Sequence, residues 1–86
     1  MIDLFVKHLS HYATLFFGPN FNIEVHTEGP MSEVRLTTYI KTLCFNNLFY
    51  ISDDMDRNQI KKSARTAIRA NIDTVTDTEF HIKELI

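Results

Sequence analysis

Four cationic side chains lie close together in the second half of the chain: Lys61, Lys62, Arg65 and Arg69. They are four of the nine basic residues and fall within nine positions, whereas the whole chain carries a formal net charge of −2. Lysine and arginine are the side chains that proteins use to bind phosphate groups. A local cationic cluster on an otherwise acidic chain therefore predicts a directed electrostatic contact with an anionic partner.

The residue types that catalyse reactions or bind metals form no comparable group. His8 and His11 are three positions apart, but no cysteine or acidic cluster completes a metal site with them. Cys44, the single cysteine, lies among alternating apolar residues, which predicts a buried structural thiol rather than a nucleophile. The chain also has no glycine-rich phosphate loop or nucleophile elbow. We therefore predict a binding protein and no enzyme, with no metal and no cofactor.

Two segments have the apolar spacing of amphipathic helices. Apolar residues recur every three or four positions from Ile2 to Phe16, and Gly18-Pro19 is a typical helix stop. A second helical pattern runs from about residue 58 to 71, after the segment Ser52-Asp53-Asp54-Met55-Asp56, which supplies several possible N-caps. The residues expected on its packing face are Ile60, Ala64, Ala67, Ile68 and Asn71. The four cations would cover a neighbouring arc about 100° wide.

Between these helices the sequence alternates between apolar and polar residues, which predicts strands at 21–25, 34–40 and 48–52. Gly29-Pro30 is expected to form the first turn and Asn46-Asn47 the second, because asparagine tolerates positive φ. The predicted fold class is α+β, an α-β-β-β-α two-layer sandwich with a three-stranded antiparallel sheet and two helices on one face. The domain would comprise residues 1–73. Residues 74–86 would form a C-terminal extension, preferably a fourth strand, with a short helix or a dimerisation element as alternatives.

The segment Lys61-Lys62-Ser63-Ala64-Arg65, followed by Ala67, resembles the Lys-Lys-x-Ala-Lys run that opens the last helix of double-stranded RNA-binding domains. Gly29-Pro30 lies where that family has Gly-Pro-x-His, in a loop that enters an RNA minor groove. Ser32 stands in place of the family's histidine, and Asp53-Asp54-Met55-Asp56 replaces the family's Gly/Ser-rich approach to the last helix. The resemblance covers about residues 2–72.

The resemblance implies that the chain recognises double-stranded or structured RNA by its shape, through phosphates and 2′-hydroxyl groups. The RNA-binding residues that it implies are Lys61, Lys62, Arg65, Arg69, Gly29, Pro30, Met31, Ser32, Lys7 and His11. Stand-alone domains of this kind include virus-encoded proteins that mask RNA or neutralise a host defence factor. We expect a similar role here.

A second hypothesis is a protein-interaction domain, such as an inhibitor or a dimeric adaptor, that uses the same fold without RNA. Exposed Phe80, Ile82 and Leu85 in the C-terminal extension would then indicate a homodimer or a protein partner. Asp3 and His8 interrupt the N-terminal apolar residues, so we expect no signal peptide, and no apolar run is long enough for a membrane span. These features, together with the single cysteine, predict a cytoplasmic protein.

Overall fold

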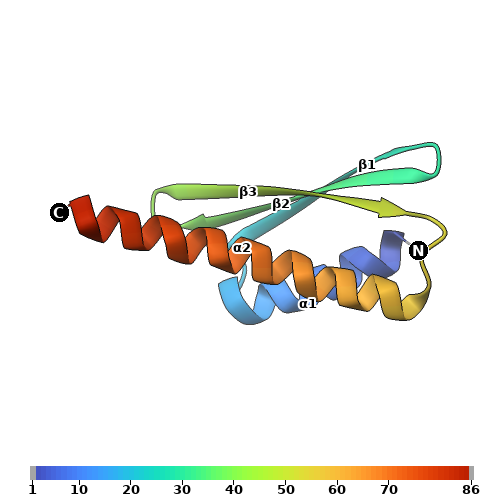
Figure 1. The fold of residues 1–86 in the computed structure, drawn as a ribbon, viewed down its shortest axis with the longest axis horizontal. Helices are drawn as coiled ribbons and strands as arrows, with labels where there is room; N and C mark the ends of the chain where they lie inside the picture. Colours follow the sequence, from blue (N-terminus) through green and yellow to red (C-terminus); the bar gives the residue numbers. More distant parts are fainter. Residues whose placement is uncertain (1, 86) are drawn as a thin grey trace.

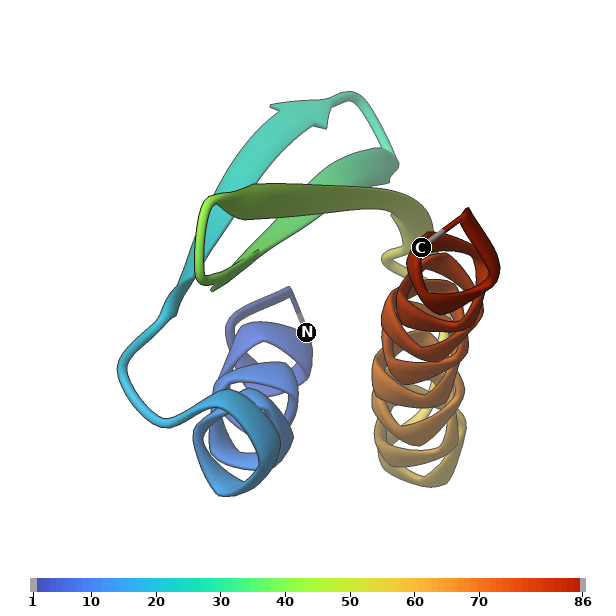
Figure 2. The same cartoon turned by 90° about the vertical axis from the view of Figure 1, so that its left-hand side faces the viewer.

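The structure is a computed structural model that describes the backbone of residues 2–85 and the side chains of residues 2–78. Its elements, in chain order, are α1 (Ile2–Phe17), β1 (Phe21–Glu28), β2 (Met31–Ile40), β3 (Leu43–Ser52) and α2 (Arg57–Leu85). The strands form one antiparallel sheet in the order β1-β2-β3. Both helices lie side by side against the same face of this sheet (Figure 1 and Figure 2). The predicted α+β class and α-β-β-β-α order are confirmed.

Helix α1 ends where the sequence indicates. Gly18 has a φ of 59°, a left-handed conformation that glycine adopts without steric cost. Its N–H donates to the carbonyl of Thr14 over 3.0 Å, which closes the last turn of the helix. Pro19 follows and cannot continue the helix, so the chain turns back into β1.

The first hairpin turn lies at the predicted Gly29-Pro30. Gly29 has a φ of 62°, and the flanking residues Glu28 and Met31 are paired across the hairpin. Positive φ at the first of two turn residues is the pattern of a type II′ turn, whose twist matches that of antiparallel strands. Proline suits the second turn position because its φ is fixed near −65°. The local sequence is therefore sufficient to place this turn.

The second hairpin turn is not at the predicted Asn46-Asn47. It lies at Lys41-Thr42, where Lys41 has a φ of 56°. Asn46 and Asn47 instead lie inside β3, opposite Thr37 and Leu36 of β2. The prediction was wrong because a lysine in the left-handed region is uncommon and leaves no signal in the sequence.

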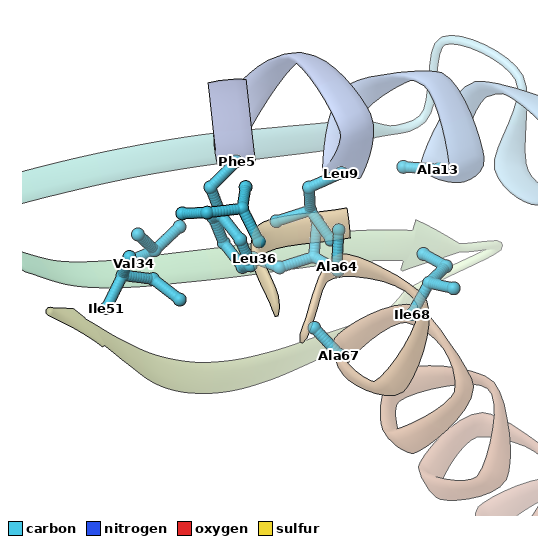
Figure 3. Packing of buried hydrophobic residues seen from close by; sticks show 10 residues of the cluster. Phe5, Leu9, Ala13, Val34, Leu36, Ile51, Ala64, Ala67 and Ile68 are labelled. Atoms are coloured by element: carbon cyan, nitrogen blue, oxygen red, sulfur yellow. The ribbon is translucent and has the colours of Figure 1, made fainter. Parts of the chain in front are cut away.

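The core lies between the two helices and the sheet face that they cover. Figure 3 shows side chains of α1, β2, β3 and α2 that meet in this cluster. Its buried members are Phe5, Leu9, Ala13, Val34, Leu36, Ile51, Ile60, Ala64, Ala67 and Ile68. The predicted packing face of the last helix is confirmed, since Ile60, Ala64 and Asn71 are all fully buried. Two residues of this face, Ala64 and Ala67, are buried alanines with small side chains.

Helix α2 is about twice as long as the predicted helix and continues to Leu85. Its 29 residues span about 43 Å at 1.5 Å per residue, close to the molecule's longest dimension of 47 Å. The preferred prediction of a fourth strand in the C-terminal extension is therefore wrong for residues 74–85. No glycine or proline interrupts the sequence of α2, and the Thr74 hydroxyl donates to the Ala70 carbonyl over 3.0 Å. The side chains of Phe80, Ile82 and Leu85 lie outside those that the structure describes.

Candidate nucleic-acid interface

The four predicted cations are all exposed on α2. They are Lys61, Lys62, Arg65 and Arg69. They extend over nine residues of helix, a rise of about 12 Å. None of them forms an ion pair with a carboxylate among the side chains of residues 2–78. This surface, which we call the cation face, therefore offers four positive charges to an external anion.

A capping box fixes the start of α2 and so the direction of the cation face. The backbone N–H of Gln59 donates to Asp56 Oδ1, and the backbone N–H of Asp56 donates to Gln59 Oε1, both over 2.9 Å. This reciprocal pair satisfies two of the backbone donors that a helix N-terminus leaves free. Met55, just before the cap, packs against the core cluster that includes Ile60. The predicted capping role of the acidic segment is confirmed for Asp56.

Arg65 is held toward α1. Its Nε donates to the hydroxyl of Tyr12 over 3.1 Å. This hydrogen bond leaves the two terminal nitrogens of the guanidinium as donors for another partner. Tyr12 follows Phe5 and Leu9 at helical spacing on α1, and this spacing gives no signal for the contact with Arg65.

The β1–β2 turn lies at the same end of the molecule as the start of α2 (Figure 1). The backbone N–H of Asp53 donates to the carbonyl of Pro30 over 3.0 Å, which ties the loop before α2 to the turn. Ile2, at the start of α1, lines a shallow cleft with Gly29, Pro30 and Asp53. The fold therefore brings together three segments that are far apart in sequence: the start of α1, the Gly29-Pro30 turn and the start of α2.

The remaining predicted RNA-binding residues differ in their exposure. Lys7 and His11 are exposed on α1, and Met31 is exposed just after the turn. Ser32 is only 7% exposed, and its hydroxyl lies 3.0 Å from that of Thr27. The residue in place of the family's loop histidine is therefore largely buried, and it lines the cleft beside Gly29 and Pro30.

The structure places carboxylates beside the cation face. Asp53 and Asp54 are exposed in the loop just before α2. Asp54 accepts a hydrogen bond from the Ser52 hydroxyl, which holds its side chain on the loop. Carboxylates have the same sign of charge as phosphate, so they weaken the attraction between nearby cations and phosphate. The local field at this end of the molecule is therefore mixed in sign.

No protein-family model, curated protein or solved structure matches this chain. The observed α-β-β-β-α order and three-stranded antiparallel sheet are consistent with the topology of double-stranded RNA-binding domains. Beyond this topology, the likeness depends on the Lys61–Arg65 run and on the Gly29-Pro30 turn.

The single cysteine does not have the predicted environment. Cys44 is exposed, so the prediction of a buried thiol was wrong. It lies on β3 opposite Tyr39, and both are exposed on the sheet face that does not carry the buried Leu36 and Thr38. No group of three or more potential metal-ligating residues was found in the part of the chain that the structure describes. None of the helices in residues 2–85 is long and apolar enough to cross a membrane.

Proposed function

We propose that this protein binds double-stranded or structured RNA through the cation face, the Gly29-Pro30 turn and the exposed side of α1. The observation that carries the proposal is that the cation face has no internal ion pair among residues 2–78 while the same helix buries the neighbouring side against the core. Masking of RNA, as by a virus-encoded protein, is the role that best fits such a module. The proposal involves no covalent chemistry.

The physics of A-form RNA supports this arrangement. Its major groove is too deep and narrow for side chains to read, so proteins contact phosphates and the 2′-hydroxyl groups of the minor groove. Lys61, Lys62 and Arg65 are exposed in the second and third turns of α2, where they can pair with phosphates across a groove. The turn at the same end of the molecule would reach an adjacent groove. Recognition of this kind depends on duplex shape and little on base sequence.

The direct test compares an RNA duplex of about 20 base pairs, longer than the roughly 16 that such domains span, with a DNA duplex of equivalent sequence. We expect tighter binding to RNA. We also expect the charge reversals Lys61→Glu and Arg65→Glu, made together, to abolish binding without unfolding the protein, because both side chains are exposed.

Lys41→Glu is the matched control for these reversals. Lys41 is an exposed lysine in the β2–β3 turn, at the other end of the hairpin from Gly29-Pro30. This variant should bind RNA nearly as well as the wild-type protein. Equal binding of RNA and DNA, or an equal loss in both kinds of variant, would argue against the proposed site.

A second candidate function is self-association through the outer edge of β3. This strand pairs with β2 on one side and is the last strand of the sheet. Its ten residues include no charged residue and no proline, and its register with β2 is unbroken. Long, uncharged edges are the ones that pair with another chain. The opposite edge, β1, is protected by Glu24, His26 and Glu28, so we propose that two copies pair through β3.

Sedimentation equilibrium tests this dimer. Tyr50 is 64% exposed on the open face of β3, so Tyr50→Lys would place a charge at the proposed edge without disturbing the core. We expect a concentration-dependent dimer in the wild-type protein and a monomer in Tyr50→Lys. Asn22→Lys, which adds the same charge to the exposed surface of β1, should remain dimeric. A monomeric wild-type protein would eliminate the second candidate and leave the RNA proposal unchanged.

A further inference from the structure

A groove of about 730 Å³ runs between α1 and α2, and its lining comes from these two helices alone. On α2 the lining extends from Lys62 to Asp73, a length of about 16 Å or three helical turns. On α1 it comprises Tyr12, Leu15 and Phe16. We call this feature the interhelical groove.

The α1 wall of the interhelical groove carries two large, exposed apolar side chains. Leu15 is 67% exposed and Phe16 is 60% exposed. Phe16 belongs to the same apolar stripe of α1 as Phe5 and Leu9, which are fully buried. The apolar stripe of α1 is therefore not covered by the core at Phe16. The opposite wall is formed by Ile68 and Ile72 of α2, and both line the groove. Adjacent exposed apolar side chains beside a groove are typical of a surface that another molecule covers.

The charge around the interhelical groove is opposite to that of the whole chain. Three of its lining residues are cations, Lys62, Arg65 and Arg69, whereas Asp73 is its single carboxylate. The chain as a whole has a net charge of −2. The Tyr12–Arg65 hydrogen bond holds one of these cations over the groove. The complementary ligand therefore has an apolar stripe flanked by acidic groups.

We propose that the interhelical groove binds an acidic amphipathic helix of a partner protein. Apolar side chains at positions i, i+3 or i+4, and i+7 of that helix would pack on Leu15, Phe16 and Ile72. Its flanking carboxylates would pair with the cations of α2. RNA phosphates could pair with the same cations, but they would make no contact with the apolar wall. An amphipathic peptide contacts both the cations and the apolar wall, and so it fits the whole groove better. This inference does not depend on RNA binding, because the interaction is measured without RNA.

A phage-displayed library of 16-residue helical peptides, selected on the wild-type protein, tests the proposal. We expect the enriched peptides to carry the apolar spacing given above and a net negative charge. A ¹⁵N–¹H titration with one such synthetic peptide should shift the amides of residues 12–17 and 62–73. Enrichment of neutral or basic peptides, no enrichment, or shifts confined to the sheet would each overturn the proposal.

Variants identify the contributing side chains. Leu15→Ser with Phe16→Ser should weaken peptide binding about tenfold or more, because two large apolar contacts are lost. Arg69→Glu is an independent variant that leaves the apolar wall intact and should weaken binding by charge repulsion. Tyr50→Ser, an equally exposed apolar site on the open sheet face, is the control and should have no effect. Peptide binding that survives both groove variants would contradict the assignment.

A binding experiment with a single-stranded RNA oligonucleotide tests whether the groove binds nucleic acid instead of a peptide. Aromatic residues beside cations can also stack nucleobases. Binding of this oligonucleotide that is lost with Phe16→Ser, in the absence of any peptide binding, would assign the groove to nucleic acid and overturn the proposal. If the protein does not bind duplex RNA but does bind the peptide, the RNA proposal fails and the peptide proposal stands.

Discussion

Asn71 of α2 and Thr38 of β2, both fully buried, are joined by a hydrogen bond of 3.2 Å from the Thr38 hydroxyl to Asn71 Oδ1. The other end of the Asn71 amide donates to Asn47 Oδ1 of β3 over 2.5 Å. One side chain of the helix therefore contacts two strands. Because a buried polar group without a partner is costly, these bonds favour one position of α2 along the sheet and so fix where its cation face points.

Replacing Asn71 should destabilise the protein. Asn71→Ala leaves the Thr38 hydroxyl and the Asn47 carbonyl without their buried partner, which costs about 2 kcal/mol. For a domain of this size the midpoint of thermal unfolding should fall by roughly 10 °C. Thr74→Ala, an exposed threonine on the same helix, is the control and should change stability by less than about 0.5 kcal/mol. Equal midpoints for Asn71→Ala and the wild-type protein would show that the network contributes little.

The packing phase of α2 can be tested at Ala64. This side chain is fully buried, and the neighbouring Lys62 and Thr66 are exposed. Ala64→Glu would bury an unpaired carboxylate and should unfold the domain, with loss of its cooperative thermal transition in far-UV circular dichroism. Thr66→Glu should retain the transition. A folded Ala64→Glu protein would mean that the helix packs through another face.

Local sequence signals were sufficient for much of this fold. The spacing of Ile60, Ala64 and Ala67 places the core side of α2 and, as a consequence, the exposure of Lys61 and Arg65. The Gly18 helix stop and the Gly29-Pro30 turn are predictable because their positive φ angles favour glycine.

The features that were missed depend on contacts between distant segments. Asn47 is typical of a turn by itself, but inside β3 its partner is Asn71, 24 residues away. The Tyr12–Arg65 bond and the exposure of Phe16 likewise depend on how α1 and α2 lie together. The extension of α2 to Leu85 was missed because the alternation around Phe80 and Ile82 also fits a strand, and short patterns do not distinguish the two.

The carboxylates before α2 should weaken RNA binding. Asp53 and Asp54 are exposed beside the first turn of α2 and oppose phosphate. Asp53→Asn with Asp54→Asn removes two negative charges and retains an acceptor for the Ser52 hydroxyl. We expect tighter binding of duplex RNA, by several-fold at low salt and less at high salt, because screening reduces the repulsion. Unchanged affinity in a filter-binding or anisotropy titration would show that these acids lie away from the RNA.

The most direct test of the central claim is the salt dependence of binding to an RNA duplex of about 20 base pairs. If all four residues of the cation face contact phosphates, log affinity should fall against log salt with a slope of about −3 to −4. That slope corresponds to a loss of about a hundredfold between 50 and 200 mM salt. Lys61→Ala with Arg65→Ala should reduce its magnitude by about two, and Lys41→Ala should leave it unchanged. No binding at low salt, or a slope that is the same in the double variant, would contradict the proposed RNA site.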